Sequence, residues 1–443
     1  MSDPSTAEQG TFFRLLQKVV AVRPDELRAV GWCWVYAFAL LAANYILTPI
    51  RDQMGVAGGV RNLPWLFAGT LAGTVLLNIP FAWLVKKLPR SRFIPLTYRF
   101  FAAILLLFAI ALHVTSGTET VWVGRIFFIW VSVANLFAIS VFWQLNVDLF
   151  SPEQGKRLFG FIAAGATIGA IVGSAFISGM ARTLSPTVLL IVAALLFEVA
   201  VFCAGRLGRL SPVLHRRPQA QAAKDDERPV GGGVLAGIVH TVRSPYLLGV
   251  SAFLLLYSVT STFVYSQQAA IVGHDLTDRA AQTAFFSNIN FGVNTVALVL
   301  QLFFTGRIVL TLGVALALAI LPVITMGGFA ALAMTPTLAV IGIFQVVRRG
   351  IEYAVTRPAR EVIYTVVSRE DRYKTKGFID TFVYRLGDQV GIWSATLFTA
   401  AGAHIAPLVA IGVAAVWLLV ALWLGTRQKK LEAEEGKAVP VPA

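Results

Sequence analysis

Charged residues are scarce in this sequence. They make up 14% of the 443 residues, against about 25% in soluble domains. Hydrophobic residues make up 57%, and the mean hydropathy is +0.72. This composition excludes an ordinary soluble domain and indicates a protein that is embedded in a lipid bilayer.

Cysteine and histidine are also few. Cys33 and Cys203 both fall within apolar runs, so neither a disulfide framework nor a cysteine metal site is supported. The five histidines are scattered near the ends of these runs or between them. The short motifs of metalloproteases, P-loop nucleotide-binding proteins and serine hydrolases do not occur. We therefore expect no enzyme activity, no cofactor and no metal site.

Long apolar runs recur along the whole chain. Each is long enough to cross a bilayer, which takes about 20 residues. Twelve are predicted, at 29–50, 63–86, 93–115, 121–147, 158–182, 186–205, 246–272, 281–304, 308–330, 336–365, 376–400 and 405–425. The predicted fold class is an all-α membrane protein of twelve transmembrane helices in two pseudo-symmetric six-helix bundles.

The net charge of +14 follows membrane topology. Lysine and arginine gather in every second connection, whereas the alternate connections at 115–120, 331–337 and 400–406 carry almost none. This is the positive-inside pattern. It predicts a multi-pass protein of a cell inner membrane with both termini in the cytoplasm, and it explains the basicity without a nucleic-acid partner.

The chain is predicted to divide into two halves. A cytoplasmic segment at 1–28, with a possible interfacial helix at 11–23, precedes a six-helix bundle at 29–205. A linker at 206–243, a second bundle at 244–425 and a tail at 426–443 follow. The stretches "SPEQGKRLFGFIAAG" from Ser151 and "SREDRYKTKGFIDTF" from Ser368 align without a gap, 217 residues apart. Two such halves are typical of the major facilitator superfamily, in which a site forms at the midplane.

The run at 336–365 carries an unusual number of charged residues for a segment inside the membrane. Gln345, Arg349, Glu352, Thr356 and Arg360 fall on one stripe, and Arg348–Glu352 and Arg357–Glu361 have the spacing of i,i+4 pairs. Charges inside a bilayer are costly unless they line a polar cavity or pair. Either the arginines bind an anionic substrate, or they form internal ion pairs that hold the bundle together.

Other runs carry polar stripes as well, which predicts a central cavity. The candidate substrate-binding residues are Arg51, Asn135, Asn146, Asn290, Asn294, Arg348, Arg349, Glu352 and Arg385. The candidate coupling or gating residues are Asp52, Asp148, Lys156, Arg157, Arg360, Glu361, Asp380 and Asp388. Arg99 is expected to reach towards the membrane surface, and Glu198 has no predicted partner.

Three stretches resemble the ATP/ADP translocases, a nucleotide transport family distantly related to the major facilitator superfamily. They are "NYILTPIRDQMGV" from Asn44, "FWQLNVDLFSPEQGKRLFGFIAAGATIGA" from Phe142 and "EYAVTRPAREVIYTVVSREDRYKTKGFIDTFVYRLGDQ" from Glu352. They cover about a fifth of the chain and occur in the family's order. The resemblance implies a nucleotide antiporter.

The sequence departs from this family where charge matters. Met54 and Asp388 stand where the family has lysines, and Val147 stands where it has a glutamate. A triphosphate would need that positive charge, so the departures favour a smaller anion.

The function we expect is secondary transport, by alternating access, of an organic anion or a nucleotide-like metabolite. The alternatives are a proton-coupled exporter of an amphipathic compound and a membrane scaffold or receptor that does not transport. The expected partners are a small anionic substrate and the lipid bilayer, with the chain acting as a monomer.

Overall fold

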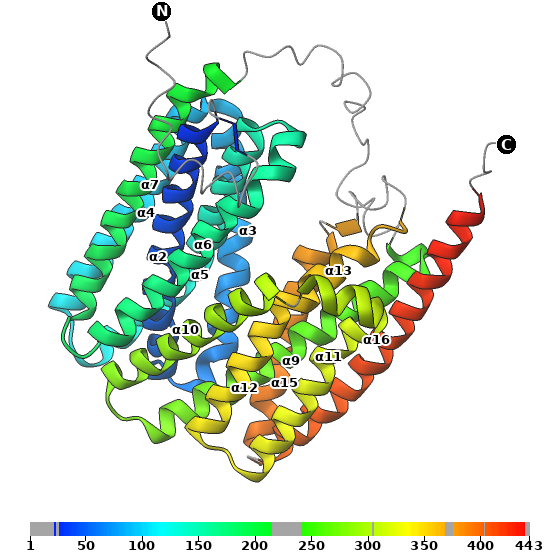
Figure 1. The fold of residues 1–443 in the computed structure, drawn as a ribbon. Coiled ribbons are helices and arrows are strands. Elements are labelled where there is room, and N and C mark those ends of the chain that lie inside the picture. Colours follow the sequence, from blue (N-terminus) through cyan, green and yellow to red (C-terminus); the bar gives the residue numbers. More distant parts are fainter. Residues whose placement is uncertain are drawn as a thin grey trace, which may run out of the picture. The chain divides into compact units, whose positions relative to one another are not determined.

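The computed structural model describes residues 22–23, 26–214, 241–303, 305–367, 375–376, 378–402 and 404–438. All regular secondary structure in these residues is helical (Figure 1). The interfacial helix expected at 11–23 lies outside the described residues, apart from its last two positions, which are not helical. Most of the expected linker also lies outside them.

Six long helices form the first half of the chain. They are α2 (Leu27–Ala57), α3 (Leu63–Lys87), α4 (Arg90–Val114), α5 (Gly117–Leu149), α6 (Pro152–Met180) and α7 (Pro186–Leu214), with a short helix η2 (Val60–Asn62) between α2 and α3. Each is long and apolar enough to cross a membrane. α7 continues nine residues into the segment expected to be linker, up to Leu214.

Six further helical segments follow. Four contain a stretch long and apolar enough to span: α9 (Pro245–Asp275), α10 (Arg279–Phe303), α11 (Thr305–Met334) and α16 (Ile405–Ala438). α11 is kinked near its start, where the backbone of Gly313 is not helical. The other two contain π-helical turns: α12 (Leu338–Ile351) continues through η3 (Glu352–Thr356) into α13 (Arg357–Ile363), and η4 (Ile379–Val383) leads into α15 (Tyr384–Ala401). α16 extends through most of the expected tail. The predicted all-α fold of twelve transmembrane helices is confirmed in the described residues.

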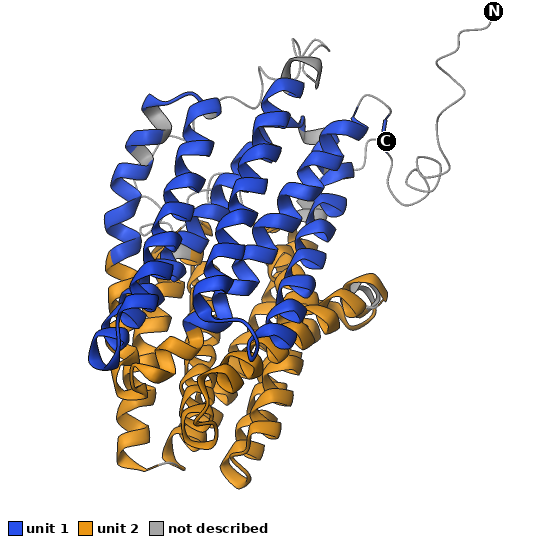
Figure 2. Cartoon of the chain, turned by 90° about the vertical axis from the view of Figure 1, so that its left-hand side faces the viewer, with its two compact units in different colours: residues 1–51, 73–227 blue, residues 52–72, 228–443 orange. Residues whose placement is uncertain are grey.

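The chain forms two compact units (Figure 2). Unit 1 comprises residues 1–51 and 73–227, and unit 2 comprises residues 52–72 and 228–443. The end of α2, the helix η2 and the start of α3 therefore belong to unit 2, although these residues precede most of unit 1 in the sequence. We call residues Asp52–Ala72 the α2–α3 tip.

In unit 1, helix α6 lies directly on the backbone of α2. A methyl group at Gly165 would lie 2.8 Å from the carbonyl oxygen of Trp34, and one at Gly173 would lie 2.6 Å from that of Ala42. A methyl group at Gly169, between them, would clash with the carbonyl of Phe38. Glycines four residues apart let two helices in a bilayer approach this closely.

Unit 2 repeats this contact between α15 and α9. A methyl group at Gly387 would lie 2.9 Å from the carbonyl oxygen of Leu255, and one at Gly391 would lie 2.9 Å from that of Val259. Leu255 and Val259 each lie 217 residues after their counterparts in unit 1, Phe38 and Ala42. The internal repeat seen in the sequence therefore extends to a backbone-to-backbone contact.

A π-helical turn accounts for the one irregularity in the repeat. Gly160 and Gly377 are 217 residues apart, but Gly169 and Gly387 are separated by 218. The extra residue in the second copy coincides with η4, which lies between Gly377 and Gly387. A π-helical turn holds one more residue than an α-helical turn, so it absorbs the insertion while the glycines keep their places against α9.

Replacing Gly169 with Ala should destabilise the protein by about 1–3 kcal/mol, because the added methyl group forces α6 away from α2. Gly160→Ala, on the same helix, provides the matched control, since no atom lies within 4 Å of the position of its Cβ. The measurement is the melting temperature of the detergent-purified protein. Equal melting temperatures for the two variants would show that the close contact does not stabilise unit 1.

Candidate functional site

The guanidinium group of Arg348 is buried in unit 2. It donates hydrogen bonds to Ser261 Oγ of α9 (2.7 Å) and to Thr325 Oγ1 of α11 (3.3 Å), and it lies 5.4 Å from the centre of the Tyr257 ring. Arg348 is 2% exposed. Its partners in the described residues are two neutral hydroxyl groups and one aromatic face, so its positive charge is not neutralised by an ion pair.

The carboxylate of Glu352 pairs with Arg357 rather than with Arg348. Arg357 Nε lies 2.6 Å from Glu352 Oε1. The predicted Arg348–Glu352 pair was therefore wrong, because Glu352 begins the π-helical turn η3. In such a turn, residues five apart face each other, which brings Arg357 to Glu352.

The guanidinium of Arg349 bonds to a different helix. It donates to Asn290 Oδ1 of α10 at 2.9 Å and lies 3.5 Å from the hydroxyl of Tyr353. Asn294 Nδ2 donates to the backbone oxygen of Asn290. The amide nitrogen of Asn290 and the hydroxyl of Thr356 are buried without a hydrogen-bond partner.

These residues form what we call the arginine cluster, defined as Asn290, Arg348, Arg349, Glu352, Tyr353 and Arg357. It brings together three arginines and one carboxylate, and of these arginines Arg348 has hydroxyl groups and not a carboxylate as its hydrogen-bond partners. A buried polar atom without a partner is expensive, and so is a buried charge. The cluster therefore has the chemistry to accept a small anion that also offers hydrogen-bond acceptors to Asn290 and Thr356.

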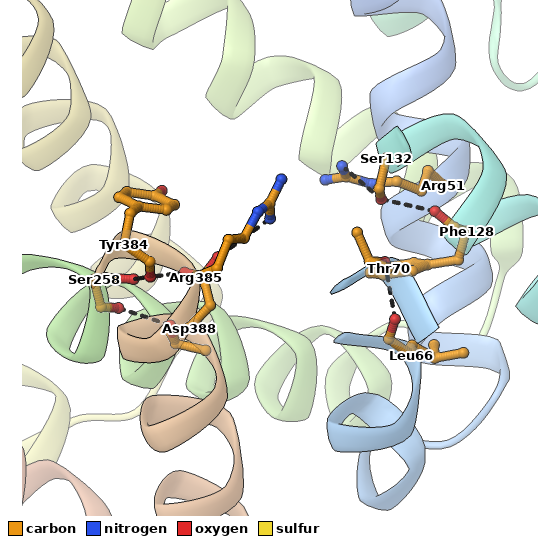
Figure 3. Close-up of polar contacts among 10 residues, drawn as sticks. Arg51, Leu66, Thr70, Phe128, Ser132, Ser258, Tyr384, Arg385 and Asp388 are labelled. Carbon is orange, nitrogen blue, oxygen red and sulfur yellow. Dashed lines mark hydrogen bonds and ion pairs between the residues drawn. The ribbon is translucent and has the colours of Figure 1, made fainter. Parts of the chain in front are cut away.

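A second ionic group lies beyond the other π-helical turn, η4 (Figure 3). The hydroxyl of Ser258 lies 2.6 Å from Asp388 Oδ1 and 2.9 Å from the backbone oxygen of Tyr384. Arg385 Nη1 lies 3.3 Å from Asp388 Oδ2. Of the candidate residues, Arg385 and Asp388 are thus brought together as an ion pair, and Asp388 is 6% exposed.

In unit 1, candidate residue Arg51 lies on α2, and Asn135 and Asn146 lie on α5. Arg51 donates to Ser132 Oγ at 3.4 Å and lies 5.2 Å from the centre of the Phe128 ring (Figure 3). Asn135 lines a small, mainly apolar cavity among α2, α4, α5 and α7. Asn146 is fully buried, and its amide nitrogen donates to the backbone oxygen of Phe142 while its side-chain oxygen has no partner.

Asp52 lies in the α2–α3 tip. Tyr265 of α9 donates to Asp52 Oδ1 at 3.2 Å, and the amide of Gln53 lies 3.5 Å from that of Gln282 at the start of α10. Trp65 meets Trp393 of α15 edge-on, with ring centres 5.2 Å apart. The α2–α3 tip thus contacts α9, α10 and α15 of unit 2 through polar and aromatic side chains.

Three candidate residues lie around the loop between α13 and η4. Glu361 pairs with Lys376 at 2.5 Å, which replaces the predicted pairing of Glu361 with Arg357. Asp380 is the second residue of η4. Its Oδ1 atom is buried without a hydrogen-bond partner, and so is the Nε atom of Arg360. Asp148 lies near the end of α5, half-buried, and the side chain of Lys156 is outside the described residues.

Arg157 makes a contact that the sequence did not suggest. Its Nη2 lies 2.8 Å from Oε1 of Glu26, just before α2, and Gln154 donates to the same oxygen at 3.0 Å. Glu26 is fully buried. Burial raises the pKa of this carboxyl group, but the hydrogen bonds from Arg157, the Arg23 backbone and Gln154 lower it by more, so the pKa lies below its usual 4.5.

Sequence reasoning missed several partners. Thr325 and Tyr353 lie at the arginine cluster, but a lone threonine or tyrosine in an apolar run gives no signal. Glu198 of α7, which had no predicted partner, pairs with Arg99 of α4 at 3.4 Å, and both side chains are exposed. The expectation that Arg99 reaches towards the membrane surface stays a prediction, and the pair with Glu198 is an additional contact. Pairing between α4 and α7 depends on their packing, which sequence spacing does not reveal.

Replacing Glu26 with Gln should destabilise the protein by about 1.5–3 kcal/mol at pH 7, the usual worth of a hydrogen bond to a charged group. The pKa of Glu26 is lowered on folding, so its contribution is present above pH 4.5 and is lost as pH falls through the folded pKa. The difference in melting temperature between wild type and variant should therefore persist from pH 7 to pH 5 and shrink below. Glu119→Gln, at an exposed acid, serves as the control. A difference that grows in acid would contradict this assignment.

No protein-family model and no curated protein matches the sequence. Solved structures do match in fold. A bacterial homologue of the human lysosomal transporter Spinster, inward-facing and unoccupied, aligns over 95% of this chain and 100% of its own, at 13% identity and a TM-score of 0.58. The nucleoside transporter NupG aligns over 91% of this chain and 99% of its own, at 16% identity and a TM-score of 0.56.

A bacterial homologue of the iron transporter ferroportin, inward-facing, aligns over 90% of this chain and 99% of its own, at 12% identity and a TM-score of 0.64. Identities this low carry the fold but not the substrate. The chain is therefore an all-α membrane protein with the fold of the major facilitator transporters.

Proposed function

We propose that this protein is a secondary transporter that moves an organic anion across the membrane by alternating access. The observation that carries the proposal is the burial of Arg348 with hydroxyl partners alone. A guanidinium group inside a bilayer is costly, and it marks a substrate pathway where no carboxylate compensates it. The structural neighbours are transporters, which agrees with this function.

The arginine cluster favours a planar carboxylate or a phosphate as the recognised group. Guanidinium groups bind both through two parallel hydrogen bonds. Nucleotide-like metabolites are the first anions to test, because three stretches resemble the ATP/ADP translocases. The pairing of Asp388 with Arg385 removes one positive charge from the vicinity, which favours a monophosphate or a carboxylate over a triphosphate.

Location and coupling are part of the same proposal. The distribution of Lys and Arg favours an inner membrane with both termini in the cytoplasm. Movement of the substrate is coupled either to the exchange of a second anion or to protons. Asp388 is the best candidate for proton binding, because it is buried and its Arg385 pair would break on protonation.

A second function is favoured by a different observation. Arg357 pairs with Glu352 and Arg385 pairs with Asp388, so two arginines are already neutralised by carboxylates. A site whose charges are balanced in this way suits an amphipathic or cationic compound exported against protons. The two functions differ in the ligand that stabilises the protein.

The contacts of the α2–α3 tip suggest how access is controlled. The tip holds to α9, α10 and α15 through Asp52, Gln53 and Trp65. Both α2 and α3 continue from the tip into unit 1. A movement of unit 1 relative to unit 2 would therefore strain these contacts, and we propose that they break and reform in each transport cycle.

Replacing Arg348 with Gln should abolish binding of the anion and leave the folded protein intact. The measurement is the shift in melting temperature of the purified protein with nucleoside mono-, di- and triphosphates, dicarboxylates and phosphate esters, since a ligand that binds the native state raises the melting point. Loss of one partner from a buried charged contact should weaken binding at least about thirtyfold. Without ligand, the variant should melt no lower than wild type, because it removes an uncompensated buried charge.

Arg99→Gln is the control for this experiment, because Arg99 also lies within a membrane helix but has an acidic partner, Glu198. It should leave the ligand-induced shift unchanged. If no anion stabilises wild type while a hydrophobic cation does, the exporter becomes the better assignment. If Arg348→Gln binds the anion as well as wild type does, Arg348 is not part of the site.

Cross-linking the tip to α10 should stop transport. Gln53→Cys combined with Gln282→Cys, joined by a short bis-thiosulfonate linker, should block substrate uptake into proteoliposomes, and a reducing agent should restore it. The two native cysteines are buried and suit a background in which only the new thiols react. Each single variant treated with the linker is the control. Undiminished transport by the cross-linked protein would show that these contacts need not open.

A further inference from the structure

A cavity of about 280 Å³ lies at the end of unit 2 where α9 begins and α16 finishes, away from the arginine cluster. One wall is a face of α16, where Trp423, Arg427 and Leu431 follow one another at intervals of four residues. The opposite wall is the first turn of α9, from Ser244 to Leu247. Val366 and Val367, which follow α13, complete it.

The wall of the cavity that contains Trp423 is held in place by close packing. The ring of Trp423 lies directly over Gly249 of α9, so closely that a methyl group at Gly249 would clash with it. The hydroxyl of Tyr246 donates to the backbone oxygen of Ile363 at 2.7 Å, and Ser244 caps the Leu247 amide. These polar groups are already used in holding the walls together.

Arg427 is the one charged side chain among the lining residues. It is exposed and makes no hydrogen bond or ion pair to another described residue. Arg243, Lys429 and Lys430 lie next to the cavity in sequence and are also exposed. Two acids on α16 follow Arg427. Glu432 accepts a hydrogen bond from Gln428. Glu434 lies about 10 Å further along the helix than Arg427. The charge that the lining residues contribute to the cavity is therefore positive.

The surface that leads to the cavity is apolar. Leu248 of α9 and Val416, Leu419 and Trp423 of α16 are all exposed. In a membrane protein such side chains face the acyl chains of lipids, and tryptophan is typical of the level of the headgroups. A molecule that fits both regions has a hydrophobic tail and an anionic head.

We propose that this cavity binds the headgroup of an anionic phospholipid, with its phosphate at Arg427 and its acyl chains along the exposed faces of α9 and α16. Basic pockets between membrane helices hold anionic lipids in this way. The lipid would bridge α9, α16 and the residues Val366 and Val367 that follow α13. The site is independent of the proposed transport activity, and its ligand need not be transported.

The test is titration of the detergent-purified full-length protein with phosphatidylglycerol, followed by melting temperature and by native mass spectrometry. Phosphatidylglycerol should stabilise wild type more than phosphatidylcholine does. Arg427→Ala should weaken the apparent affinity for phosphatidylglycerol about fivefold, the contribution of one basic residue near anionic lipid. Arg427→Lys should keep most of it. Trp423→Leu should also weaken binding, because it removes one wall without changing the charge.

Arg206→Ala is the matched control. Arg206 follows Phe202 on α7 by four residues, as Arg427 follows Trp423, but its guanidinium lies over the Phe202 ring. It should bind phosphatidylglycerol like wild type. Equal binding by Arg427→Ala and wild type, or an equal loss in Arg206→Ala, would overturn the proposal in favour of diffuse charge. Stabilisation by soluble glycerol 3-phosphate as strong as that by the lipid would assign the cavity to a free phosphate instead.

Discussion

The hydrocarbon interior of a bilayer offers no hydrogen bonds, so each backbone N–H and C=O must be paired within the protein. The twelve helical segments satisfy this requirement along almost all of their length. In the described residues the α-helical pattern is interrupted at two π-helical turns, Glu352–Thr356 and Ile379–Val383, and at the kink of α11 at Gly313. Both π-helical turns lie in unit 2, next to the arginine cluster or to the Asp388–Arg385 pair. The π-helical backbone is thus found beside the charged side chains, which is where π-helical turns often occur in functional sites.

The arginines of this region are tolerated in two different ways. Arg357 and Arg385 have carboxylate partners, so each pair is close to neutral. Arg348 bonds to two hydroxyl groups, so it keeps its charge available. A neutral pair stabilises a bundle without attracting a ligand, whereas a solvated or hydroxyl-bonded guanidinium still attracts an anion. The difference supports assigning substrate recognition to Arg348 and a structural role to Arg357.

The same kind of glycine-mediated helix contact occurs in both units. In unit 1, Gly169 and Gly173 of α6 lie against the backbone carbonyls of Phe38 and Ala42 in α2. In unit 2, α15 packs on α9 in the same way. The equivalence survives an inserted residue, because η4 takes up the extra length. An insertion that would otherwise rotate the rest of α15 by about 100° is confined to one turn.

The sequence by itself determined the spans and the internal repeat, because hydrophobic length and the similarity of two stretches can be read along the chain. The helices on which the glycines of α6 and α15 pack were decided by the tertiary structure. The sequence also identified Arg348, Arg349 and Asp388 as unusual. Only the tertiary structure decided their partners. The i,i+4 pairing expected for Glu352 failed, because a π-helical turn has a spacing that no α-helical pattern contains. Likewise, the placement of Asp52–Ala72 in unit 2 and the pairing of Glu26 with Arg157 depend on segments far apart in the chain, which come together only when the helices pack.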